Sequence, residues 1–239
     1  MIKLILRKFL SSLDDIDSYI GARRVRRSPK RSLHNVLWER ATQQSADFVE
    51  EFLPHSMIFI SKEDMWAYVS KKIHDRYEGG VCVEFGVAGG TSINFISARL
   101  PKFKFFGFDS FEGLAEDWVG HHATKGAYSQ NGNLPIVNEN VSLVKGWFSD
   151  TIQPFINSVD ENDLRLIHID SDTYEAAEIV FNNIGDKIKS GCLILFDELI
   201  GYPNWKNGEY RALEEAQRKF NFKYKFLAFS SEQALIEIL

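Results

Sequence analysis

The chain has 239 residues, enough for one sizeable domain with an appendage, and 44% of them are hydrophobic and 26% charged, as in ordinary globular proteins. No apolar stretch is long enough to span a bilayer, and the N-terminus lacks the features of a secretory signal, so we expect neither a membrane-spanning nor a secreted protein. The net charge of −5 argues against nucleic acid as a partner. Both cysteines, Cys82 and Cys192, fall in predicted buried strands, which indicates a reducing compartment such as the cytoplasm.

The N-terminal segment differs from the rest in charge. Residues 1–32 hold nine Lys or Arg against three Asp, which makes the segment +6 and leaves −11 for the remainder. Such an arm could make a weak peripheral contact with a membrane surface, but we favour a solvated helix and arm that packs on a neighbouring subunit of a homo-oligomer. A broken apolar stripe predicts a helix over residues 33–54. We assign 1–60 to a helical extension and 61–239 to the main domain.

The main domain is organised around a strand, a glycine-rich turn and a helix. Apart from Glu84, residues 81–85 are apolar, as is typical of a strand buried on both faces, and residues 92–98 have helical periodicity. The turn between them has glycines at positions 86, 89 and 90. This is the entry unit of a nucleotide-binding α/β fold, but the spacing G-x-x-G-G lacks the dinucleotide fingerprint G-x-G-x-x-G.

Two acidic residues indicate which nucleotide would bind. Glu84 lies at the end of the first strand, where a carboxylate would repel a pyrophosphate but would suit a cationic ligand such as S-adenosylmethionine (SAM). Asp109 ends a second apolar strand, over residues 105–109, and is placed to bind a ribose diol. Together they favour SAM.

Residues 115–140 are polar and have no clear period, which is typical of a lid or binding loop. The loop contains Trp118 and the adjacent pair His121 and His122. Adjacent histidines cannot both point one way on a regular element, so we favour substrate or surface contacts over a metal pair.

The rest of the chain alternates strands and helices. Strands are predicted at 141–146, 164–170 and 191–198, with helices after each, and a closing hairpin at 224–229 and 234–238. The pattern predicts a doubly wound, mostly parallel, seven-stranded α/β sheet with an antiparallel C-terminal hairpin.

Four acidic residues follow two of these strands. Asp170 and Asp172 come at the end of one, and Asp197 and Glu198 at the end of the next. Ligands of such sheets bind beyond the carboxyl ends of the strands, and crowded carboxylates repel one another unless a cation neutralises them. All-oxygen ligands favour Mg²⁺ or Ca²⁺. The alternatives are a helix N-cap for Asp172, with Glu175 as its partner, and a solvated strand end for the other pair.

Several motifs in fixed order resemble the macrocin O-methyltransferase (TylF/MycF-like) family. They are VEFGVAGGTS at 83–92, GFDSFEGL at 107–114, GWF at 146–148, HIDSDTY at 168–174 and FDE at 196–198. The resemblance covers the chain from about residue 55 to its end. It implies a class I SAM-dependent enzyme that methylates sugar hydroxyls with the help of Mg²⁺.

The resemblance also implies roles for residues. The cofactor would be held by Ser56, Met57, Glu84, Gly86, Val87, Ala88, Gly89, Thr91, Ser92, Asp109, Ser110, Trp147, Phe148 and Asp170. Metal ligands would be Asp170, Asp197 and Glu198, and the catalytic pair would be Asp172, as a base, with Asp170. Two positions depart from the family: strand-ending acids are often two aspartates rather than Asp197 and Glu198, and Ala115 stands where a proline is common.

We therefore expect a SAM- and divalent-metal-dependent O-methyltransferase acting on a hydroxyl of a sugar or a sugar-containing small molecule. The acceptor pocket would be shaped by Trp118, His121, His122, Trp205 and Tyr210. The alternatives are a catechol-type O-methyltransferase, a nucleotide-binding oxidoreductase, and a non-catalytic protein that keeps the SAM fold.

Overall fold

The structure, a computed structural model, describes residues 32–160 and 163–239, so the expectations for the basic arm lie outside the described residues except at Ser32. The contacts of the chain divide it after Glu39, and Arg40–Leu239 form one compact unit. Helix α2 (Leu33–Glu50) crosses this division. Residues 40–60, assigned from the sequence to the extension, thus belong to the larger unit by their contacts. None of the described helices is both long and apolar enough to cross a membrane.

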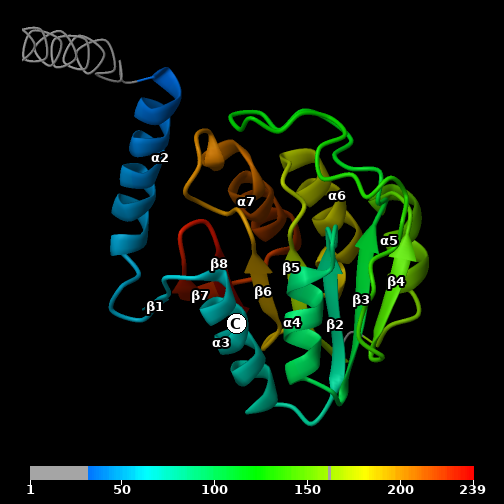
Figure 1. The fold of residues 1–239 in the computed structure, drawn as a ribbon. Coiled ribbons are helices and arrows are strands. Elements are labelled where there is room, and N and C mark those ends of the chain that lie inside the picture. The colour runs from blue at the N-terminus through cyan, green and yellow to red at the C-terminus, as the bar shows by residue number, and fades with distance from the viewer. Residues whose placement is uncertain (1–31, 161–162) are drawn as a thin grey trace, which may run out of the picture. The chain divides into compact units, whose positions relative to one another are not determined.

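The larger unit is built on one sheet of eight strands in the order β1-β7-β8-β6-β5-β2-β3-β4 (Figure 1). The strands are β1 (Met57–Ile58), β2 (Gly80–Phe85), β3 (Phe103–Asp109), β4 (Val141–Lys145), β5 (Leu164–Ile169), β6 (Leu193–Phe196), β7 (Tyr224–Phe229) and β8 (Ala234–Ile238). Only β8 is paired antiparallel with its neighbours, so the predicted parallel sheet with an antiparallel hairpin is confirmed.

The strand count differs from the predicted seven because β1 adds an edge strand. Met57 pairs with Ala228 and Ile58 with Phe229, parallel to β7. A strand of two residues is too short to show an alternating pattern, so the sequence of residues 57–58 does not predict a strand.

Helices cover both faces of the sheet. Figure 1 shows α3 (Lys62–His74) and α4 (Thr91–Arg99) in front, and α5 (Phe148–Ile156), α6 (Tyr174–Ile184) and α7 (Glu209–Phe220) behind. Ser61 is the N-cap of α3, and its side chain accepts a hydrogen bond from the Asp64 amide at 3.1 Å. No helix lies between β3 and β4; turns and irregular backbone occupy the predicted loop instead.

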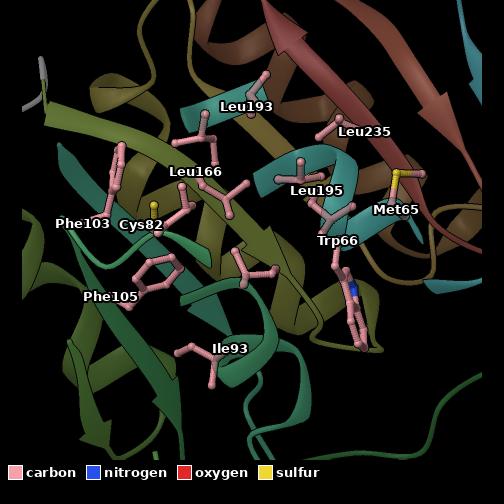
Figure 2. Packing of buried hydrophobic residues seen from close by; sticks show 14 of the residues in the cluster. Met65, Trp66, Cys82, Ile93, Phe103, Phe105, Leu166, Leu193, Leu195 and Leu235 are labelled. Carbon is pink, nitrogen blue, oxygen red and sulfur yellow. The ribbon is translucent and has the colours of Figure 1, made fainter. Parts of the chain in front are cut away.

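The core on the front face is made by alternate residues of the central strands. Figure 2 shows the side chains that pack there, namely Cys82, Phe103, Phe105, Leu166, Leu193, Leu195 and Leu235 from strands, with Met65, Trp66 and Ile93 from α3 and α4. Each has at most 6% of its surface exposed. Because a close-packed core is rigid, the loops that follow these strands are held at fixed positions relative to one another.

Candidate active site

A cavity of about 600 Å³ opens at the carboxyl ends of the parallel strands. Its walls come from the turn after β2, the end of β3, the loops after β5 and β6, the predicted binding loop and the start of α5. The lining includes Gly86, Ala88, Asp109, Ser110, Trp147, Phe148, Asp170, Asp172, Asp197 and Glu198. The glycine turn and the four acids predicted from separate motifs therefore face one space.

The glycine turn is held by Asp109. Its Oδ2 accepts hydrogen bonds from the amides of Val87 and Ala88, both at 2.8 Å, and its Oδ1 accepts one from Phe111 at 2.6 Å. A carboxylate has about four acceptor sites, so these bonds leave Asp109 capacity for a ligand hydroxyl. Gly86 has a φ of +94°, and a Cβ there would lie 1.6 Å from the carbonyl oxygen of Asp170. Only glycine therefore lets β2 approach the loop after β5 this closely.

Glu84 lies behind the turn, with 2% of its surface exposed, and it does not line the cavity. Its Oε1 accepts a hydrogen bond from the Ser92 hydroxyl at 2.9 Å, and its Oε2 lies 2.8 Å from Nδ1 of His168. Ser92 does not line the cavity either. Glu84 and Ser92 thus lie outside the cavity lining, and their contact with SAM stays a prediction. A buried carboxylate so placed supports the turn and the helix from below.

His168 is a residue that the sequence reasoning missed. It is fully buried in β5, with its Cα opposite that of Glu84 in β2. Burial lowers the pKa of His168, but the charge of Glu84, the nearby Asp197 carboxylate and the hydrogen bond that Glu84 accepts outweigh it and raise the pKa to about 10. The signal that could have found His168 is the pairing of β2 with β5, which sets it beside the buried Glu84.

The acids gather closely. One ligand oxygen each of Asp170, Asp172 and Glu198 lie within 4.8 Å of one another. Burial and the neighbouring Asp197 carboxylate raise the pKa values of Asp170 and Glu198 well above their usual range. Burial also raises the pKa of Asp197, but His168, Glu198 and Lys62 together bring it below its usual value. This cluster is therefore an unstable arrangement of charge unless protons or cations balance it.

Asp172 does not cap the following helix. Thr173 is the N-cap of α6, and its hydroxyl accepts a hydrogen bond from the Ala176 amide at 3.2 Å. Asp172 instead has a φ of +65° and lines the cavity. Burial, followed by the charge of Asp197, raises its pKa to about 7. A carboxyl group that titrates near neutrality is suited to exchange protons with a bound substrate.

The donor set fits a hard divalent cation. All the cavity-facing acids offer oxygen, which Mg²⁺ and Ca²⁺ prefer. Glu198 Oε2 is buried and has no hydrogen-bond partner among the described residues. Asp197, in contrast, is engaged on both oxygens, because Gln233 Nε2 donates to Oδ1 and Lys62 Nζ donates to Oδ2. The geometry thus leaves Asp170, Asp172 and Glu198 most open to a metal ion.

A second buried acid supports the cluster from outside the cavity. Glu209, the first residue of α7, is fully buried and accepts hydrogen bonds from the amide and hydroxyl of Ser171 and from the amide of Glu198, each at 3.4 Å. It therefore joins the loops that carry both acid pairs. Nothing in the sequence near Glu209 distinguishes it from an exposed helix-start acid.

The predicted acceptor residues divide into two groups. Trp118 and His121 line the cavity, whereas His122, Trp205 and Tyr210 do not. Trp205 and Tyr210 pack on Phe48, each with ring centroids 5.3 Å away. Their placement supports packing rather than acceptor contact.

The remaining predicted cofactor residues lie at different depths. Ser110, Trp147 and Phe148 line the cavity, Val87 is buried beneath the turn, and Thr91 is exposed at the start of α4. Gly89 is outside the lining set. Ser56 donates to the carbonyl of Phe226 at 3.1 Å, and Met57 is half-exposed in β1; neither lines the cavity.

The comparisons agree with this fold. Residues 83–199 match the family model described as a methyltransferase domain. The fold is similar to that of CalS11, a calicheamicin methyltransferase, with a TM-score of 0.58 and 20% identity over 86% of this chain and 93% of that one. It is also similar to the O-methyltransferase NovP, with a TM-score of 0.56 and 19% identity over 74% and 78%. No curated protein sequence matches the chain. Residues 83–199 therefore form a methyltransferase domain, and the chain has the fold seen in CalS11 and NovP.

Proposed function

We propose that this protein is a SAM- and divalent-metal-dependent O-methyltransferase that acts on a hydroxyl of a sugar or a sugar-containing small molecule. The observation that carries the proposal is that the glycine turn and four carboxylates line one cavity of about 600 Å³. A donor on the turn and an acceptor at the acids would meet within that space, which is of ordinary size for a small-molecule site.

The cofactor half of the cavity suits SAM. Asp109 stands beside the turn with acceptor capacity left for the ribose, and Trp147 and Phe148 offer aromatic surface for the adenine. The carboxylates at the other side provide negative potential for the sulfonium and ammonium groups. Gly86 and Ala88 place backbone against the ligand.

The acceptor half suits a hydroxyl group. Asp172, ionised above a pKa of about 7, would take the hydroxyl proton as the oxygen attacks the methyl carbon and the carbon–sulfur bond breaks. Bound SAM would supply the methyl group to the oxygen, would keep the bonding pair on its sulfur and would leave as neutral S-adenosylhomocysteine. Holding both partners in line supplies much of the rate.

A metal ion would be held by Asp170 and Glu198, with Asp197 as a further ligand once the Lys62 ammonium leaves its Oδ2. Asp172, the third open acid, is assigned to the proton instead. When bound, the metal ion would lower the pKa of an acceptor hydroxyl and orient it. The unpartnered oxygen of Glu198 and the all-oxygen donor set support this part of the proposal.

A sugar is the acceptor we favour. One structure with this fold is titled a TDP-rhamnose 3'-O-methyltransferase. The cavity is also lined by Trp118 and Tyr128, and aromatic faces pack well on sugar rings. A catechol would present a similar pair of oxygens to the acids and is the second candidate.

We also propose that the protein works in the cytoplasm, and the two cysteines support this. Cys82 and Cys192 are buried free thiols, as in proteins of a reducing compartment such as the cytoplasm. Assembly into a homo-oligomer stays a prediction.

The test is turnover of SAM. Purified protein is incubated with SAM and a panel of nucleotide sugars, glycosides and catechols, and S-adenosylhomocysteine is measured with Mg²⁺ and, after exhaustive chelation, with EDTA. We expect turnover with a sugar acceptor that falls by at least about 100-fold in EDTA. Full activity in EDTA would show that the reaction needs no metal ion. Binding of S-adenosylhomocysteine with no methyl transfer to any acceptor would indicate the non-catalytic alternative.

A further inference from the structure

One cation of the chain already lies in the acidic cluster. Lys62, the first residue of α3, lines the cavity, and its ammonium donates a hydrogen bond to Asp197 Oδ2 and lies 3.4 Å from Glu198 Oε1. The two acids are 94% and 90% buried at the side chain, so this ion pair is poorly screened by water. Lys62 therefore contributes one positive charge where the cluster is most crowded.

The position of this charge overlaps with the proposed metal ligands. With Gln233 on Oδ1 and Lys62 on Oδ2, Asp197 has a donor on each of its oxygens. Glu198 has Lys62 near Oε1, and its Oε2 is left without a partner among the described residues. A divalent ion that took oxygens from both acids would meet the Lys62 ammonium at the same place.

Lys62 is able to leave. Its side chain is 34% exposed, so part of it already lies at the surface rather than in the core. A lysine has a flexible stem of four carbons, and it can swing the charge into water while its helix stays in place. The preceding N-cap at Ser61 fixes the backbone from which it swings.

We propose that Lys62 is a tethered counter-ion that competes with the divalent cation for Asp197 and Glu198, so that metal binding displaces it from the cluster. The proposal rests on the metal site of the proposed function. Its physical basis is that an ammonium and a divalent ion held against the same two carboxylates repel each other strongly at such a short distance.

Removal of Lys62 would then have two opposite effects. Without metal, the acids lose their neutralising partner, so the apoprotein becomes less stable. With metal, no lysine has to be displaced, so the ion binds more tightly. A lysine that merely bridges structural elements would show the first effect and not the second.

The experiment measures Mn²⁺ binding by full-length protein without acceptor, using the electron paramagnetic resonance signal of free Mn²⁺. We expect Lys62→Met to bind Mn²⁺ at least about tenfold more tightly than the wild type, a lower bound set by one charge-assisted hydrogen bond. The melting temperature of Lys62→Met should fall in EDTA and recover in Mn²⁺. Lys71→Met, which removes a largely exposed lysine of the same helix, is the matched control and should change neither quantity.

A second measurement needs no variant. Mn²⁺ should increase the acylation of Lys62 in the wild type, read by mass spectrometry after brief treatment with an amine-reactive ester, because the freed ammonium enters solvent. Unchanged Mn²⁺ affinity in Lys62→Met, or unchanged labelling on Mn²⁺ addition, would overturn the competition while leaving the metal site in place. Absence of Mn²⁺ binding in both proteins would overturn the metal site and the competition together.

Discussion

At the scale of single residues, conformation decides which acids reach the cavity. Asp172 faces the cavity because its backbone is left-handed, at a φ of +65°, and Thr173 takes the cap of α6. Asp172 and Thr173 are both good capping residues, so the sequence allows either of them to be the N-cap of α6. The motif at 168–174 predicted that Asp172 belongs to the active site. Only the backbone conformation shows that its side chain faces the cavity and does not cap α6.

Asp172→Asn tests the assigned base. The amide keeps the size of the side chain but cannot accept the proton, so we expect kcat to fall about 100-fold or more while S-adenosylhomocysteine affinity changes little. Glu175→Gln, which changes an exposed acid three residues after Asp172 in the first turn of α6, is the matched control and should keep wild-type turnover. Wild-type kcat in Asp172→Asn would assign the proton to another group.

At the scale of elements, α7 begins beneath the two loops that carry the acids. Glu209, at its first position, accepts hydrogen bonds from both loops and is fully buried. Burial, followed by the charge of Asp172, raises its pKa to about 8. The helix and its strong amphipathic pattern were predictable, but its docking under the loops depends on residues far away in the chain.

Glu209 makes stability depend on pH. Its folded pKa is raised above the unfolded value of about 4.3, so the folded protein holds a proton that the unfolded chain releases between these values. The free energy of unfolding therefore falls as pH rises towards 8, by at most about 1.4 kcal/mol per pH unit from this group.

Glu209→Gln removes this proton, so its melting temperature in EDTA should vary less steeply than that of the wild type between pH 5 and pH 8. Thermal melts at half-unit steps measure the two slopes, with Glu175→Gln as the exposed control. Equal slopes in Glu209→Gln and wild type would show that Glu209 is ionised in the folded protein.

At the scale of the whole molecule, the main unit begins earlier than the methyltransferase motifs. The second half of α2 packs on it: Phe48 lies 5.3 Å from Trp205 and 5.7 Å from Phe226 between ring centroids, and Gly201 donates to the Ser45 hydroxyl at 2.9 Å. Strand β1 then extends the sheet beside β7. These contacts explain why the chain divides after Glu39 and not after residue 60.

Truncation tests this division. A chain that begins at Arg40 should melt within about 2 °C of the full chain. A chain that begins at Ser61 loses Phe48, Phe52 and β1, and it should melt about 10 °C lower, since burying each aromatic side chain stabilises the fold by about 1.5–3 kcal/mol. Equal melting of all three chains would support the predicted boundary at residue 60.

The sequence by itself determined the sheet class, the order of motifs and the identity of the acids at the strand ends. Local periodicity and strand-end residues carry that information, because neighbours in a parallel sheet bring their carboxyl ends to one edge. Tertiary structure alone decided that Glu84 pairs with His168 behind the turn, that Trp205 and Tyr210 pack on Phe48, and that Lys62 and Gln233 reach Asp197. The physical reason is range: each of these contacts joins residues more than 35 positions apart, and no local pattern encodes such a pairing.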